Sequence, residues 1–137
     1  MPPFWLSHHH QEEWGRTYRV AGVRLCARCI GTYPAMFVAI ALQLARNAPL
    51  AWAYDGAWSV LLLLPALADW ARGRFRPASG SNALRTATGV LLGLALGRTL
   101  YVHLRHPFPA WLLVQAALVT AVAAPVILAS YRRRGRT

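Results

Sequence analysis

Apolar residues gather into four blocks along the chain, separated by short segments that carry most of the arginines. A helix needs about 20 residues to cross the hydrocarbon core of a bilayer. The last two blocks approach or exceed that length, and the first two reach it when their flanks at 30–34 and 50–53 are included. The pattern therefore predicts an all-α fold, an integral membrane bundle of about four transmembrane helices: Tyr33 to Ala45, Ala57 to Trp70, Thr86 to Leu104 and Pro109 to Tyr131.

The blocks leave no room for a separate soluble domain. We expect a single membrane domain, 1–137, with a cytoplasmic N-terminal segment at 1–30, a helical bundle at 31–131 and a basic tail at 132–137. Three prolines refine this picture. Pro34 suits the first turn of the first helix, whereas Pro65 and Pro125 lie inside the second and fourth blocks and should kink them.

The charge pattern indicates a partner for the protein and its orientation in the membrane. The formal charge is +11, all fifteen basic residues are arginine, and 56% of the residues are hydrophobic. In a soluble protein this basicity would suggest nucleic acid, but long blocks almost without charge argue against a nucleic-acid-binding module, so we expect the lipid bilayer as the partner and no nucleic acid.

Most of the arginines lie on one side of a four-span arrangement. Cytoplasmic connections accumulate arginine, so both termini are predicted to face the cytoplasm, most simply at the plasma membrane. A three-span or five-span arrangement would divide the clusters between the two sides. Twelve of the fifteen arginines make up this side: Arg16, Arg19, Arg24, Arg28, Arg72, Arg74, Arg76, Arg85, Arg132, Arg133, Arg134 and Arg136.

Both cysteines, Cys26 and Cys29, stand in the stretch RLCARCIGTYP just before the first block. On the cytoplasmic side thiols stay reduced, which disfavours a structural disulfide. Three interpretations remain: a redox pair, half of a metal site, or two ordinary buried thiols. A redox pair is typically set in a βαβ unit, for which the sequence has no pattern. Gly31 would let backbone N–H groups approach a thiolate.

A metal site needs two further ligands, and histidines are available upstream. His8, His9 and His10 follow one another in WLSHHHQEEW. Two thiolates and two imidazoles form a tetrahedral structural zinc site, and C-x2-C is a usual half of it. Consecutive histidines are less usual, because neighbouring side chains diverge on regular structure. Histidines near a terminus are also often solvated or in contact with lipid headgroups, so the spacing alone leaves both interpretations open.

Two further groups of residues have a structural and a functional interpretation. Asp69 ends the second block, where it could reach Asn82 or Arg85 at the start of the third. An ionisable residue at membrane depth suggests a functional role, but an ion pair that joins two helices is the simpler interpretation.

Small residues at four-residue spacing let helices approach closely in lipid, and this spacing predicts helix packing at Gly89, Gly93 and Gly97.

These motifs together resemble a family of small membrane proteins known as domain of unknown function 2085. The resemblance covers about Leu6 to Leu104 and rests on S-H-H, on R-L-C-A-R-C-I-G-T-Y-P, on the aspartate that ends the second block, and on S-N-A-L-R-T-A-T-G. Many members carry Cys-His where this chain has two histidines. The resemblance thus implies that His8 replaces that cysteine and His9 matches the histidine, which completes a zinc site with Cys26 and Cys29.

The resemblance also groups Asp69, Asn82, Arg85, Thr88 and Gly89 as a polar cluster beneath the metal site. It implies a fold and a site but no reaction. Whether His10 takes the place of His8 or His9, and whether another metal binds, stays open at this point.

A zinc ion with four protein ligands has no position for substrate, and catalysis needs one. No H-E-x-x-H or nucleophile motif is present. The sequence therefore favours a protein without enzymatic activity, a membrane scaffold or accessory subunit whose structural zinc holds the N-terminal segment, with a membrane-protein partner or a second copy of the chain. The alternative is a membrane-embedded enzyme or transporter that acts on a lipid or ion through Asp69, Asn82 and Arg85.

Overall fold

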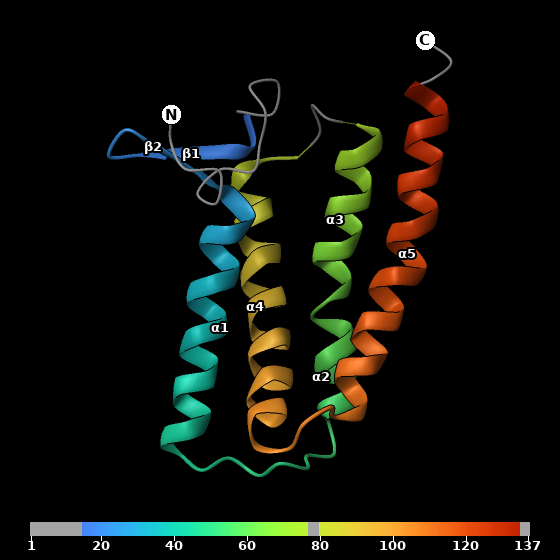
Figure 1. The fold of residues 1–137 in the computed structure, drawn as a ribbon. Coiled ribbons are helices and arrows are strands. Elements are labelled where there is room, and N and C mark those ends of the chain that lie inside the picture. Colours follow the sequence, from blue (N-terminus) through green and yellow to red (C-terminus); the bar gives the residue numbers. More distant parts are fainter. Residues whose placement is uncertain (1–14, 77–79, 135–137) are drawn as a thin grey trace.

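A computed structural model describes residues 15–76 and 80–134 of the chain (Figure 1). His8, His9 and His10 lie outside the described residues. Five helices follow a short hairpin. The elements are β1 Thr17–Val20, β2 Val23–Cys26, α1 Ala27–Ala45, α2 Asp55–Leu61, α3 Leu64–Phe75, α4 Asn82–Arg105 and α5 Ala110–Arg134.

Among the described residues, three helices are long and apolar enough to cross a membrane: α1, α4 and α5. These agree with the first, third and fourth blocks of the sequence, and the predominantly helical fold is confirmed. The second block is divided between α2 and α3, neither of which is long enough to qualify by itself. The two short helices follow one another in a single column between α4 and α5 (Figure 1).

The division between α2 and α3 lies just before Pro65. Proline has no N–H to donate and clashes with the preceding turn, and here the Leu63 amide donates to the carbonyl oxygen of Val60 instead of continuing the α-helical pattern. The Ser59 carbonyl oxygen accepts a hydrogen bond from Gln115 Nε2 of α5 at 3.1 Å instead. A neighbouring helix thus satisfies the backbone group at the interruption, as low-dielectric surroundings require.

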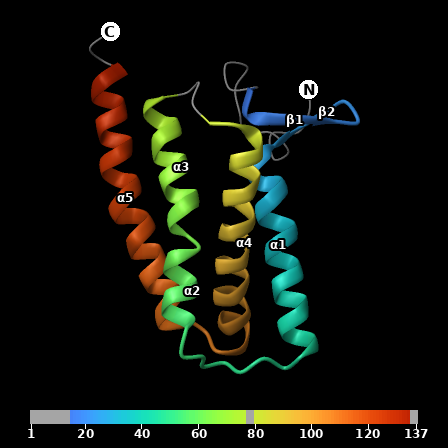
Figure 2. The same ribbon diagram turned by 180° about the vertical axis from the view of Figure 1, so that it is seen from behind.

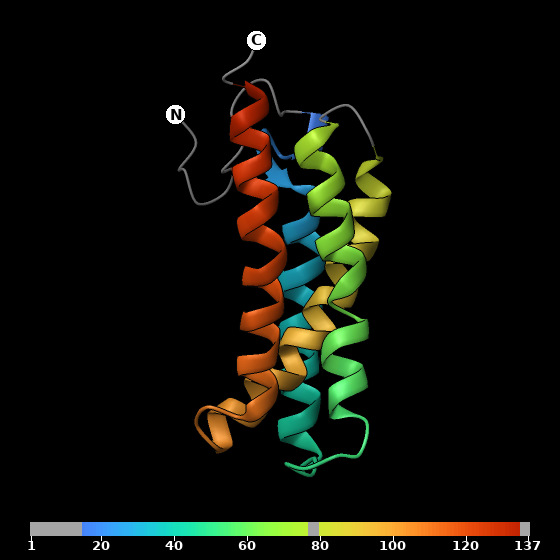
Figure 3. The same cartoon turned by 90° about the vertical axis from the view of Figure 1, so that its right-hand side faces the viewer.

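The helices form a row. Figures 1 and 2 show the order α1, α4, the α2–α3 column, α5, and the main packing interfaces are between neighbours in this row. Figure 3 views the row from the α5 side, with α5 and the α2–α3 column in front of α4 and α1. The hairpin, the end of α3, the start of α4 and the end of α5 share one end of the molecule, which we call the hairpin end.

A short hairpin, which the sequence pattern did not predict, is added to the helical fold. β1 and β2 pair antiparallel, with Thr17 opposite Cys26 and Val20 opposite Val23. The two residues between the strands, Ala21 and Gly22, have φ of 48° and 81°. Positive φ at both central positions gives a turn whose twist matches that of the strands. A short ladder therefore precedes the first helix.

The first helix begins earlier than predicted. It starts at Ala27 rather than near Tyr33, so Pro34 is its eighth residue and not part of its first turn. Cys26 is the residue that precedes the helix, and Cys29 lies in its first turn. The expectation for Pro34 was wrong because apolar periodicity does not reveal a helix start within the polar segment before it.

Glycines set the distance between α1 and α4. A Cβ atom placed on Gly93 would overlap the Thr32 carbonyl oxygen and lie 2.9 Å from Ala35 Cβ, and one on Gly97 would lie 2.7 Å from Ala39 Cβ. Gly89 faces the Arg28 carbonyl oxygen in the same way. Backbone therefore packs on backbone along this interface.

Gly31 of α1 belongs to the same interface, where an added Cβ would overlap the carbonyl oxygen of Thr86 and lie 2.9 Å from the Val90 nitrogen. The sequence interpretation of Gly31 as a neighbour of a thiolate did not anticipate this packing. Thr86 also joins the two helices through a side-chain hydrogen bond of 2.9 Å to the carbonyl oxygen of Ala27.

Candidate functional site

The two cysteines lie together at the start of α1. Cys26 ends β2 and is buried, whereas Cys29 is half-buried, and neither is in a disulfide. Residues three apart lie on the same side of a helix, and the side chains of Cys26 and Cys29 interact with each other. The two thiol side chains therefore lie next to each other at the helix start.

The hairpin returns the N-terminal side of the chain to these thiols, because Thr17 is the ladder partner of Cys26. His9 precedes Thr17 by eight residues, and an extended chain of that length spans roughly 28 Å. Both predicted imidazole ligands are thus within reach of the sulfurs. Within residues 15–76 and 80–134, no group of three or more histidine, cysteine or acidic side chains is arranged to hold a metal ion.

The predicted polar cluster lies at the hairpin end. Asp69 of α3 forms an ion pair with Arg28 of α1, and the two side chains are 8% and 21% exposed. A Cβ atom placed on Gly80 would lie 3.5 Å from Asp69 Oδ1 and 3.6 Å from Arg85 Nη2, so Asp69 and Arg85 approach the same glycine. Arg28 was counted in the sequence only as an orientation charge, and its pairing with Asp69 was missed.

The other members of this cluster connect α4 to the hairpin. Asn82 Nδ2 donates to the Thr17 carbonyl oxygen at 3.2 Å, and Asn82 Oδ1 accepts from Arg85 Nη1 at 3.3 Å. The Thr88 hydroxyl is buried and donates to the Arg85 carbonyl oxygen. Asn82 thus fixes the register of the hairpin against α4, directly beside Cys26.

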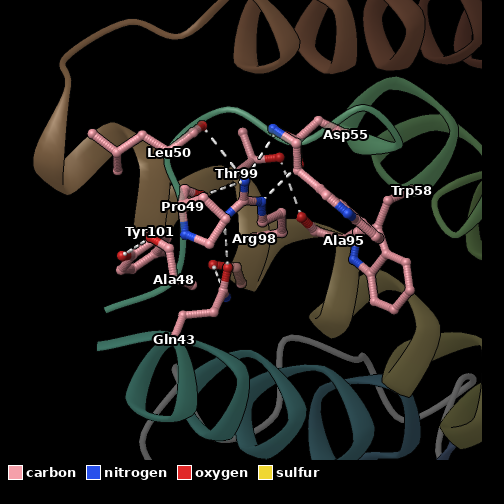
Figure 4. Close-up of polar contacts among 12 residues, drawn as sticks. Gln43, Ala48, Pro49, Leu50, Asp55, Trp58, Ala95, Arg98, Thr99 and Tyr101 are labelled. Atoms are coloured by element: carbon pink, nitrogen blue, oxygen red, sulfur yellow. Dashed lines mark hydrogen bonds and ion pairs between the residues drawn. The ribbon is translucent and has the colours of Figure 1, made fainter. Parts of the chain in front are cut away.

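A second polar network, absent from the sequence interpretation, lies at the opposite end of α4 (Figure 4). Arg98 Nε donates to Asp55 Oδ1 at 2.7 Å, and Arg98 Nη2 donates to Asp55 Oδ2 at 3.0 Å. The guanidinium also donates to Gln43 Oε1 at 3.1 Å and to the Pro49 carbonyl oxygen at 2.9 Å. Both charged side chains are over nine-tenths buried.

This network links three parts of the fold. Gln43 belongs to α1, Pro49 to the connection that follows it, and Asp55 begins α2. Tyr101, one turn after Arg98, donates to the Ala48 carbonyl oxygen at 2.7 Å. One sequence signal could have revealed the pair: an arginine inside an apolar block needs a counter-charge, and Asp55 is the acidic residue between the first and second blocks.

Comparison with known proteins gives one match. A family model described as predicted membrane protein (DUF2085) matches residues 9–100, about two-thirds of the chain. The matched segment contains the hairpin, both cysteines, the polar cluster at Asp69 and the Arg98 network, and it ends within α4. Neither the curated proteins nor the solved structures contain a match.

Proposed function

Because this chain belongs to DUF2085, a family of predicted membrane proteins, we propose that it crosses the membrane four times, with α2 and α3 together forming the second crossing. The fourth crossing is supported by the column that α2 and α3 form beside α4 and α5 (Figure 1). Arginines are concentrated at the hairpin end, where α3 and α5 end. The hairpin end therefore faces the cytoplasm, together with both termini, in the plasma membrane.

We further propose that the protein is a membrane scaffold or accessory subunit with a structural zinc site. The ligands are Cys26, Cys29, His8 and His9, which would fix the N-terminal segment on the hairpin. The observation that supports this proposal is the pairing of Thr17 with Cys26, which brings the first residue of β1 next to the two thiols. The helix start also suits the site, since its positive dipole end stabilises thiolates.

The zinc site is tested by elemental analysis of the full-length protein purified in detergent without chelators. We expect about one zinc per chain in the wild type, as a closed four-ligand site requires, and loss of most of it in Cys26→Ser and Cys29→Ser. His8→Ala and His9→Ala should lose zinc as well. His106→Ala, at the opposite end, is the control and should retain it. Equal metal content in the cysteine variants and the wild type would contradict the proposal.

One observation favours the alternative of an enzyme or transporter for a lipid or ion. The side chains of Asp69, in the middle of α3, and of Arg85, in the first turn of α4, are both almost completely buried. Buried ionisable groups in membrane proteins often belong to transport or catalytic pathways. The working group in this case would be Asp69, Asn82 and Arg85.

The two functions differ in their response to Asp69→Asn. For a scaffold, complementation of a deletion strain should follow the amount of folded protein in the membrane, because Asp69 then only joins α3 to α1. For an enzyme or transporter, complementation should fail although the membrane contains at least about half the wild-type amount. The amount of protein in the membrane is measured by immunoblot, and complementation is measured as growth of the same cells. Thr120→Val, on the exposed face of α5, is the control.

A further inference from the structure

Arginines lie at the ends of two neighbouring helices, α3 and α5. Arg72 and Arg74 lie in the last turn of α3, and Arg132 and Arg133 lie near the end of α5. Arg74 is half-buried and the other three are exposed; we call these four residues the α3–α5 basic surface. Because α1 and α5 are the two edges of the row (Figures 1 and 2), this surface lies away from the cysteines at the start of α1.

Contacts with neutral groups of the opposite helix hold two of these arginines in place. Arg74 Nε donates to Ser130 Oγ at 3.2 Å, and the Arg74 guanidinium lies 6.0 Å from the ring centroid of Tyr131. In the other direction, the Arg133 guanidinium of α5 lies 5.1 Å from the ring centroid of Phe75 of α3. Cation–π contacts orient a guanidinium group but do not neutralise it. The charges are therefore positioned between the two helices and still need an anion.

The carboxylates among the described residues are Asp55 and Asp69, and both are paired elsewhere. Asp69 forms its ion pair with Arg28 of α1, and Asp55 pairs with Arg98 at the opposite end of the molecule. The C-terminal end of a helix contributes about −0.5 elementary charge, so the ends of α3 and α5 together offset roughly one of the four positive charges. The α3–α5 basic surface thus keeps a net charge of about +3.

Exposed apolar side chains adjoin the arginines on the same two helices. Tyr131 is 63% exposed and Leu128 61%. Leu128 precedes Arg132 by four residues, so the two side chains share one face of α5, with Leu128 one turn closer to the middle of the helix. A small soluble anion would contact only the arginines. A lipid with an anionic headgroup contacts both, because its acyl chain can follow α5 past Leu128.

We propose that the α3–α5 basic surface binds an anionic phospholipid, with the headgroup phosphate on the arginines and an acyl chain along Leu128. Guanidinium groups match phosphate oxygens because they offer paired N–H donors in one plane. Basic surfaces between transmembrane helices on the cytoplasmic side suit anionic headgroups. The inference rests on the membrane orientation proposed above, which places this surface at the cytoplasmic leaflet, and it is independent of the zinc site.

The test is a lipid titration of the full-length protein in detergent, with bound lipid counted by native mass spectrometry. One arm adds phosphatidylglycerol, a second adds phosphatidylcholine, and a third adds glycerol phosphate, which has the anionic group but no acyl chains. We expect phosphatidylglycerol to bind at least about tenfold more tightly than either of the others. Equal binding of the two lipids would overturn the proposal. Glycerol phosphate that binds as tightly as phosphatidylglycerol would overturn the assignment to a lipid.

Variants locate the site. The Arg72→Gln, Arg132→Gln double variant should weaken the affinity for phosphatidylglycerol roughly thirtyfold, since each arginine near a membrane surface contributes to the binding of anionic lipid. Both side chains are exposed, and the double variant keeps the contact of Arg133 with Phe75, so the fold should be unchanged. The matched control is Arg19→Gln, Arg105→Gln, which removes the same charge from exposed positions on β1 and at the far end of α4. Equal losses in the two double variants would contradict the proposal.

Zinc content measured on the same samples separates this site from the proposed metal site. The Arg72→Gln, Arg132→Gln variant should contain as much zinc as the wild type, because its substitutions lie on α3 and α5 and the thiols lie on α1. In Cys26→Ser, the affinity for phosphatidylglycerol should conversely stay within about twofold of the wild type. A joint loss of zinc and lipid in the arginine variant would show a change of the whole hairpin end, and it would contradict a binding surface confined to α3 and α5.

Discussion

Asp55→Ala is expected to lower the free energy of unfolding by about 3–5 kcal/mol, the usual cost of leaving one member of a buried ion pair without its partner. Arg98 would keep its charge more than nine-tenths buried and would lose both of its bonds to the carboxylate. The Trp52 amide, which donates to Asp55 Oδ2 at 3.1 Å, would lose its acceptor as well. The connection between α1 and α2 should loosen together with α4.

Unfolding in detergent by a mild denaturant, followed by tryptophan fluorescence, measures this effect. Arg98→Met should cost a similar amount, whereas the Asp55→Ala, Arg98→Met double variant should cost clearly less than the sum of the two, because no uncompensated charge is left. Arg105→Gln, on the exposed end of the same helix, is the control and should stay within about 0.5 kcal/mol of the wild type. Additive losses in the double variant would show that the pair is not coupled.

The second large effect is expected at the interface between α1 and α4. Alanine favours a helix over glycine by about 1 kcal/mol, yet Gly93→Ala should destabilise the protein by about 1–3 kcal/mol, as overpacking in a tight core does. The added methyl would overlap the Thr32 backbone, which cannot move away as a flexible side chain could. The larger Gly93→Leu should prevent α1 and α4 from packing and should reduce the amount of folded protein in the membrane.

Gly73→Ala is a matched control, which separates the effect of packing from the effect of helix propensity on the free energy of unfolding. A Cβ placed on Gly73 of α3 would meet Arg16 at 3.6 Å, an ordinary contact. Gly73→Ala is therefore expected to be neutral or slightly stabilising under the same denaturant, whereas Gly93→Ala is destabilising. Equal effects at both positions would mean that the close approach of α1 and α4 contributes little to stability.

Apolar block lengths predicted the three long helices α1, α4 and α5, because burial in lipid requires long uninterrupted apolar segments. They did not predict the hairpin. The usual signal for its tight turn is Asn-Gly, and here the turn residues are Ala21 and Gly22, with alanine in the left-handed region. The early start of α1 was hidden as well, since its first turns include Arg28 and pack on α4 through the small residue Gly31, so they do not form an apolar stripe of their own.

The polar contacts were predicted only in part. Asp69, Asn82 and Arg85 lie at the same end of the molecule, but the ion-pair partner of Asp69 comes from α1, and no local spacing relates Arg28 to Asp69 41 positions later. Arg98 likewise pairs with a residue 43 positions away. Such partners depend on which helices are neighbours, and the order α1, α4, α2–α3, α5 could not be derived from block lengths. The zinc ligand set stays a prediction, since His8 and His9 lie outside the described residues.

Arg85 and Arg98 together affect the depth of α4 in the bilayer. They are 13 positions apart on one helix, which at 1.5 Å per residue separates them by roughly 20 Å along its axis, and each is held by a network at its own end of the molecule. A vertical displacement of α4 by one turn in either direction would draw one of the two cations toward the hydrocarbon midplane. The two arginines thus fix the position of α4 along the membrane normal, and they oppose displacement of the helix along its own axis.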